Sequence, residues 1–101
     1  IFPLPLMNNY KSFFYSNINS LATTQVKSGA GYLHTITINK SGASSNTISV
    51  YDATSGTTSP IAVIDGTATA GNTLLFDINF INGLRIITAT GTAADITVSW
   101  E

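Results

Sequence analysis

The chain has 101 residues, a length that fits a single domain with a core of its own. Apolar residues make up 44% of the sequence, charged residues only 9%, and the formal net charge is −1. These values exclude a disordered composition and predict no nucleic-acid partner, because phosphate binding needs concentrated Lys and Arg. Cys is absent and no apolar run is long enough to span a bilayer, so we expect no disulfide, no thiolate metal site and no membrane partner.

The first part of the chain, residues 1–17, differs from the rest. It combines many large apolar side chains with Pro3 and Pro5, which disfavour a helix or a central strand, so we predict an extended N-terminal arm. Such an arm would expose much apolar surface in water. We therefore expect it to dock on a neighbouring subunit, with folding back over its own domain and disorder as the alternatives. The residues predicted to make the partner contacts are Phe2, Leu4, Leu6, Met7, Tyr10, Phe13 and Phe14.

Residues 18–101 alternate between apolar and polar with a period of two, which is typical of strands. Segments rich in Gly, Ser, Thr, Asn and Asp separate these runs and indicate turns. No segment has helical periodicity. We predict one all-β domain, a single antiparallel β-sandwich that is jelly-roll-like and has about seven strands. The residues predicted to fill its core are Ile36, Ile38, Ile48, Val50, Phe76, Ile78, Ile86, Ile96 and Val98.

The only histidine, His34, is the first candidate for chemistry. Alternation places it on one face of its strand with Tyr32 and Ile36. A hairpin with the next strand along the chain would place His34 opposite Asp52, within reach of a hydrogen bond. We therefore predict a structural pair, His34 and Asp52, in which the largely buried imidazole is hydrogen-bonded near Asp52 or to the backbone. Such a pair is also half of a hydrolytic triad, but no GxSxG elbow is present, so no catalytic residue is predicted.

The remaining side chains indicate no metal and no cofactor. A single His, no Cys and acidic residues that are far apart in sequence match neither a zinc site nor a calcium loop. The glycines fit turns better than a phosphate cradle. Tyr32 and Tyr51 are candidates for stacking on a sugar, whereas Trp100 alternates with Ile96 and Val98 and is expected in the core. We predict no metal-binding and no cofactor-binding residue.

Several phrases occur in a recognisable order, namely TTQVKSGAGYLHTITIN, NTISVYDATSG, IAVID and NGLRIITATGTAADITVSWE. With these phrases, residues 23–101 resemble small β-sandwich virion structural proteins of tailed bacteriophages. Those proteins share a Lys-Ser-Gly-x-Gly turn, a Leu-His strand, an Ile/Val-Tyr-Asp strand, Gly-Leu and a closing Thr-Ala-Asp-Ile-Thr-Val strand. The residues before position 23 lie outside the resemblance.

The resemblance implies a non-enzymatic structural role in the virion, such as capsid decoration (cement), head fibre or tail component, and it transfers no catalytic residue. It also implies a homo-oligomer, a trimer, that is assembled in the host cytoplasm and bound to the major capsid protein or another virion protein. Two rival hypotheses stay open. One is a tail or fibre component that acts as a receptor- or glycan-binding module, and the other is a small hydrolase built around His34.

Overall fold

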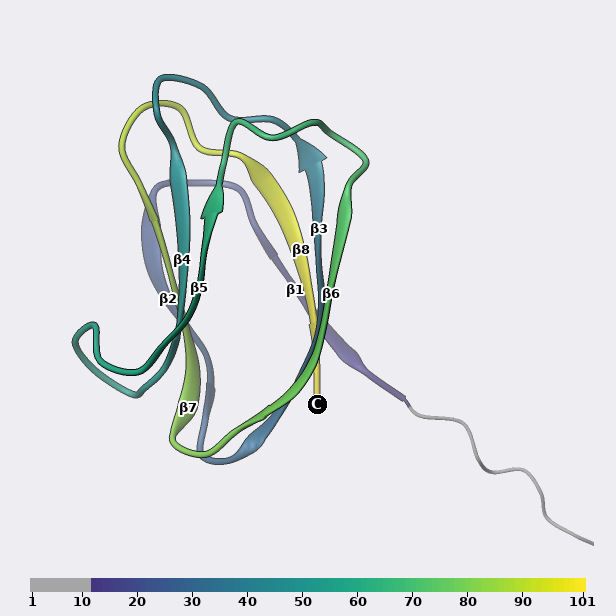
Figure 1. The fold of residues 1–101 in the computed structure, drawn as a ribbon, viewed down its shortest axis with the longest axis vertical. Coiled ribbons are helices and arrows are strands. Elements are labelled where there is room, and N and C mark those ends of the chain that lie inside the picture. Colours follow the sequence, from purple (N-terminus) through teal and green to yellow (C-terminus); the bar gives the residue numbers. More distant parts are fainter. Residues whose placement is uncertain (1–11) are drawn as a thin grey trace, which may run out of the picture.

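The computed structural model describes residues 12–101, which form eight strands (Figure 1). The strands are β1 (Phe14–Ile18), β2 (Ala22–Ser28), β3 (Gly31–Lys40), β4 (Thr47–Asp52), β5 (Pro60–Asp65), β6 (Thr73–Phe80), β7 (Gly83–Ala89) and β8 (Asp95–Trp100). The described part of the chain contains no helix, and therefore none of the length and apolarity needed to cross a membrane. The prediction of an all-β chain is confirmed.

The strands form two four-stranded antiparallel sheets that face each other as two layers (Figure 1). One sheet has the order β1-β8-β3-β6 and the other the order β2-β7-β4-β5. Only β4 and β5 follow each other both in the chain and within a sheet, since every other link crosses from one sheet to the other. This arrangement confirms the predicted antiparallel sandwich, with one strand more than the seven expected.

The core lies between the two sheets and comes from inward-facing residues of both. Seven of the nine predicted core residues are buried. The buried seven are Ile36, Ile38, Ile48, Val50, Ile86, Ile96 and Val98. The other two predictions need correction, because Phe76 is only half-buried against the core and Ile78 keeps 36% of its surface exposed. Both lie on β6, an edge strand that has a neighbour on one side only.

The predicted arm is partly wrong, because its last residues belong to the sandwich. Phe14 to Asn17 are in β1, which pairs with β8 through five consecutive residue pairs. Ile18, the last residue of β1, is buried and anchors the strand to the core. The predicted boundary at residue 17 therefore falls inside β1. Of the predicted arm contacts, Phe2, Leu4, Leu6, Met7 and Tyr10 lie outside the described residues.

Candidate functional site

An irregularity in the pairing of β3 with β6 shapes the outer face of the first sheet. Leu33 pairs with Ile78 and Thr35 pairs with Leu75, so two residues of β6 lie opposite one residue of β3. The single residue is His34, and the two opposite it are Phe76 and Asp77. Asp77 has a φ of 51°, a left-handed conformation that Asp tolerates better than most residues. A bulge of this kind changes the direction of the side chains beside it.

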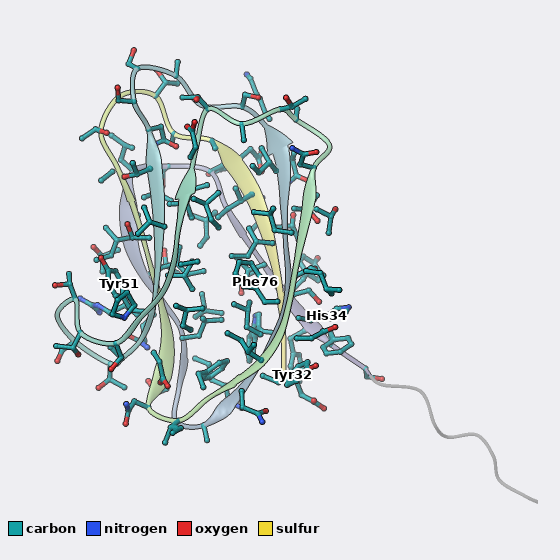
Figure 2. The ribbon with its side chains drawn as sticks, viewed as in Figure 1. Tyr32, His34, Tyr51 and Phe76 are labelled. Atoms are coloured by element: carbon teal, nitrogen blue, oxygen red, sulfur yellow. The ribbon has the colours of Figure 1, made fainter. Side chains whose placement is uncertain are left out.

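His34 points away from the core and contacts Asp77 on the outer face. The two atoms His34 Nδ1 and Asp77 Oδ1 lie 2.5 Å apart, and the side chains keep 33% and 41% of their surface exposed. Figure 2 shows His34 and Tyr32 outside the sheet, whereas Phe76 points between the two layers. The carboxylate fixes the orientation of the imidazole ring.

Aromatic rings complete this group of side chains. The ring of Phe13 stacks on His34 with centroids 4.3 Å apart and planes at 8°, and it also stacks on Tyr32 at 6.2 Å. We call Phe13, Tyr32, His34 and Asp77 the His34 cluster. Phe13 packs against its own sheet because it lies just before β1 and reaches across to β3, and its contact with a partner stays a prediction.

The predicted pair of His34 with Asp52 is wrong. β3 and β4 belong to different sheets, because the link between them crosses the sandwich instead of forming a hairpin. Asp52 lies at the end of β4 and accepts hydrogen bonds from the backbone N–H groups of Ile81, Asn82 and Gly83 at 2.9, 2.7 and 3.2 Å. It therefore holds the turn between β6 and β7. His34 is also half-exposed instead of largely buried.

The contacts of Asp52 change its ionisation. Partial burial raises its pKa, and the backbone hydrogen bonds from Ile81, Asn82 and Gly83 lower it by more, so the pKa of Asp52 lies below its ordinary value of 3.8. Two other carboxyl groups share this direction. Hydrogen bonds from the hydroxyl and the backbone of Thr67 lower the pKa of Asp65, and hydrogen bonds from Asn39 and Asn17 lower that of Asp95.

These lowered pKa values predict that acid destabilises the protein. Each ionised carboxylate stabilises the fold above its unfolded pKa of about 3.9, and this contribution is lost as the pH falls through the lower pKa of the folded state. We expect the free energy of unfolding, measured by urea titration, to fall below about pH 4. In Asp52→Asn the fall should be smaller, because one of the titrating groups is gone. An identical pH profile in the variant would contradict the role assigned to Asp52.

On the sheet β1-β8-β3-β6, the part of the outer face that lies away from the His34 cluster is polar. Asn17 and Asn39 donate to Asp95 Oδ1 at 2.6 and 3.0 Å, and Asn39 also donates to the hydroxyl of Thr97 at 2.9 Å. These bonds join β1, β8 and β3 across the face. Among residues 12–101, the stacked rings of Phe13, Tyr32 and His34 lie at the end opposite to this polar group.

The structure separates the residues that were candidates for sugar stacking. Tyr32 lies on β3 and Tyr51 on β4, so they are on different sheets and cannot form one platform (Figure 2). Trp100 was expected in the core but is only partly buried against it, and its Nε1 donates to the hydroxyl of Ser16 at 3.0 Å. The ring of Phe14 lies 5.1 Å from that of Trp100, while Phe14 itself remains largely exposed.

A shallow open hollow adjoins the His34 cluster. Its volume is about 490 Å³, and Lys27, Tyr32, Asn79 and Ile81 are among the residues that line it. Tyr32 therefore borders both the hollow and the cluster. Within residues 12–101 no group of three or more His, Asp or Glu side chains is arranged to hold a metal ion. What the cluster offers chemically is aromatic surface beside an oriented imidazole and a carboxylate.

Sequence reasoning missed Asp77 because the apolar residues Leu74, Phe76, Ile78 and Phe80 alternate without a break and hide the bulge. One signal was present. Asp is depleted in strands, so an Asp in the middle of an apolar run indicates an irregular position. No comparable signal indicated that Phe13 would stack on His34.

Comparison of the chain with protein-family models, with curated proteins and with solved structures finds no match.

Proposed function

We propose that this protein is a non-enzymatic structural protein of a tailed-phage virion, a capsid decoration (cement) protein that binds the shell through subunit contacts. The observation that carries the proposal is the strand order, β1-β8-β3-β6 in one sheet and β2-β7-β4-β5 in the other. This is the order expected of two Greek keys wound into a jelly roll, an architecture that recurs in viral capsid and lectin domains. An architecture shared with viral capsid domains supports this role by analogy of fold.

The character of the surface also supports the proposal. Only 9% of the residues are charged, so the surface of the protein is weakly ionic. Weak surface charge removes the electrostatic repulsion that keeps proteins apart. A surface of this kind suits a subunit that packs among neighbours on a shell.

The apolar residues at the start of the chain are proposed as the contact with the shell. Phe13 stacks on His34 and β1 pairs with β8, so both belong to the edge region of the first sheet, next in sequence to these apolar residues. Within this proposal the protein is a homo-oligomer, a trimer, that binds the major capsid protein or another virion protein. Its location is the virion, after assembly in the host cytoplasm.

The test uses the full chain with Phe2, Leu4, Leu6 and Met7 changed to Ser. Because these residues precede the described sandwich, the variant should keep its β-type circular dichroism spectrum but should no longer be retained on purified phage particles. A matched control carries the same kind of change at Val63 and Leu75, which are exposed on the sandwich, and should be retained. Equal retention of both variants would contradict the assigned contact, and absence of the wild-type chain from particles would contradict the function.

The His34 cluster favours one alternative, a tail or fibre component that binds a receptor or a glycan. Stacked aromatic rings beside polar side chains are a common way to bind sugars, and Phe13, His34 and Asp77 provide both on one face. Binding on a glycan array that is lost in Phe13→Ala but kept in Tyr51→Ala, on the opposite sheet, would favour this alternative over decoration.

A further inference from the structure

The two sheets end in four edge strands. These are β1 and β6 in one sheet and β2 and β5 in the other. An edge strand presents backbone N–H and C=O groups to which another strand can pair. Proteins that stay separate block their edges with bulges, charged residues or Pro.

Three of the four edges carry such features. In β6 the bulge places Asp77, with its positive φ, in the middle of the strand. In β2 the register with β7 shifts at Val26, and the charged Lys27 follows it. β5 begins with Pro60, which has no N–H to donate, and its register with β4 also shifts. Each of these strands would pair poorly with a strand from outside.

The fourth edge, β1, lacks all of these features. Its sequence FYSNI contains no Pro and no charged residue. Its pairing with β8 is unbroken over five residue pairs, and among the described residues no strand other than β8 pairs with it. Phe14 and Tyr15 are 64% and 76% exposed although they lie within a regular strand. β1 has five residues, which is close to the mean length of a strand, so it is long enough to pair with a strand from outside.

We propose that β1 pairs with β1 of a second copy of this chain, in antiparallel orientation around a two-fold axis. The pairing joins the two four-stranded sheets of the two copies into one continuous sheet. A register centred on Ser16 sets Phe14 opposite the partner's Ile18 and Tyr15 opposite the partner's Asn17. Apolar residues then face apolar ones on the side of the core, and polar groups meet on the outer side.

Two observations favour a second copy over another occupant. Because β1 is uncharged, two copies of it meet without opposing like charges, which would destabilise cross-strand pairs. The start of the chain is a poorer strand partner, because Pro3 and Pro5 cannot donate to a ladder. A two-fold contact is also the commonest closed symmetry and does not grow into fibres.

This inference does not rest on the proposed function. It is a two-fold contact, so it is separate from the three-fold contact of a trimer, and trimers joined to each other through β1 would form an assembly with an even number of copies. The expected mass in solution is therefore that of a dimer or of a larger even-numbered assembly. A strict monomer, or a trimer alone, would overturn the inference.

The absence of Cys allows a direct test with spin labels. Tyr15 and Leu75 are the matched positions, because both are well exposed and they lie at the two ends of one row across the same sheet, through Ser99 and Thr35. A label on Tyr15→Cys should lie close enough to its copy to show strong dipolar broadening of the continuous-wave EPR spectrum. A label on Leu75→Cys, at the far edge of the sheet in each copy, should show no such broadening. Coupling at Leu75 alone would assign the contact to β6. An absence of coupling at both positions would also overturn the inference. This is the result expected if residues of the same chain, and not a second copy, cover β1.

A second pair of variants tests the same contact without a label. Tyr15→Lys introduces the charge that blocks natural edges and should remove the dimer peak in size-exclusion chromatography with light scattering. Leu75→Lys places the same charge on β6 and should leave the dimer peak unchanged. An equal response of the two variants would contradict pairing through β1. Circular dichroism shows whether each variant remains folded.

Discussion

Shortening Ile36 to alanine should lower the free energy of unfolding by roughly 2–5 kcal/mol, the range for a buried Ile or Leu truncated in a packed core. Ile36 has no exposed surface. It lies in the middle of β3, between Val98 of β8 and Leu74 of β6, so both neighbouring strands pack around it. The removed methyl and methylene groups leave a cavity that the two sheets cannot close without shifting. Urea unfolding at neutral pH measures the loss.

The control for this prediction is Leu75→Ala on the same sheet. Leu75 is also aliphatic, but it is 67% exposed on the outer face, so its truncation should change stability by less than about 0.5 kcal/mol. Similar losses in the two variants would contradict the position of the core between the sheets.

Replacing Asn46 with alanine should cost roughly 3 kcal/mol or more, because buried polar groups that lose their partners keep the full cost of leaving water. Asn46 is 1% exposed. Its Nδ2 donates to the carbonyl oxygens of Ala89 and Thr90 at 3.1 and 3.0 Å, and its Oδ1 accepts from the N–H of Ala94 at 3.2 Å. One side chain thus satisfies three backbone groups around the link between β7 and β8.

Asn46 also packs tightly against Gly66. A side chain on Gly66 would collide with the Asn46 amide, and the N–H of Gly66 donates to the backbone carbonyl of Asn46 at 2.8 Å. Asn46 itself lies in the link before β4. Its contacts therefore join this link to Gly66, in the link after β5, and to Ala94, in the link before β8.

The control for Asn46 is Asn39→Ala, the same substitution on an exposed Asn that also donates two hydrogen bonds. Because water can replace exposed partners, its cost should stay below about 1 kcal/mol. Domains of this size are typically stable by about 5–15 kcal/mol, so the Asn46 variant should remain folded enough to be measured. Equal costs would show that the buried amide does not hold the links together.

The sequence alone determined the class of the fold and most of its core. Alternation with a period of two is a local property, since successive side chains of a strand point to opposite faces. It therefore identified residues such as Ile36, Val50 and Ile96 as inward-facing wherever the strand is regular and has neighbours on both sides. It failed at Ile78, on an edge strand beside a bulge, where neither condition holds.

Only the tertiary structure decided which strands are neighbours, because alternation marks a face but does not name the strand beside it. The link from β3 to β4 crosses between sheets, which separates His34 from Asp52. A bulge then brings Asp77 to His34 across 43 residues of sequence, and Phe13 reaches the same ring from the start of the chain. Asn46 joins three links in the same way. These contacts depend on long-range pairing and on one irregular residue, and neither leaves a periodic signal in the sequence.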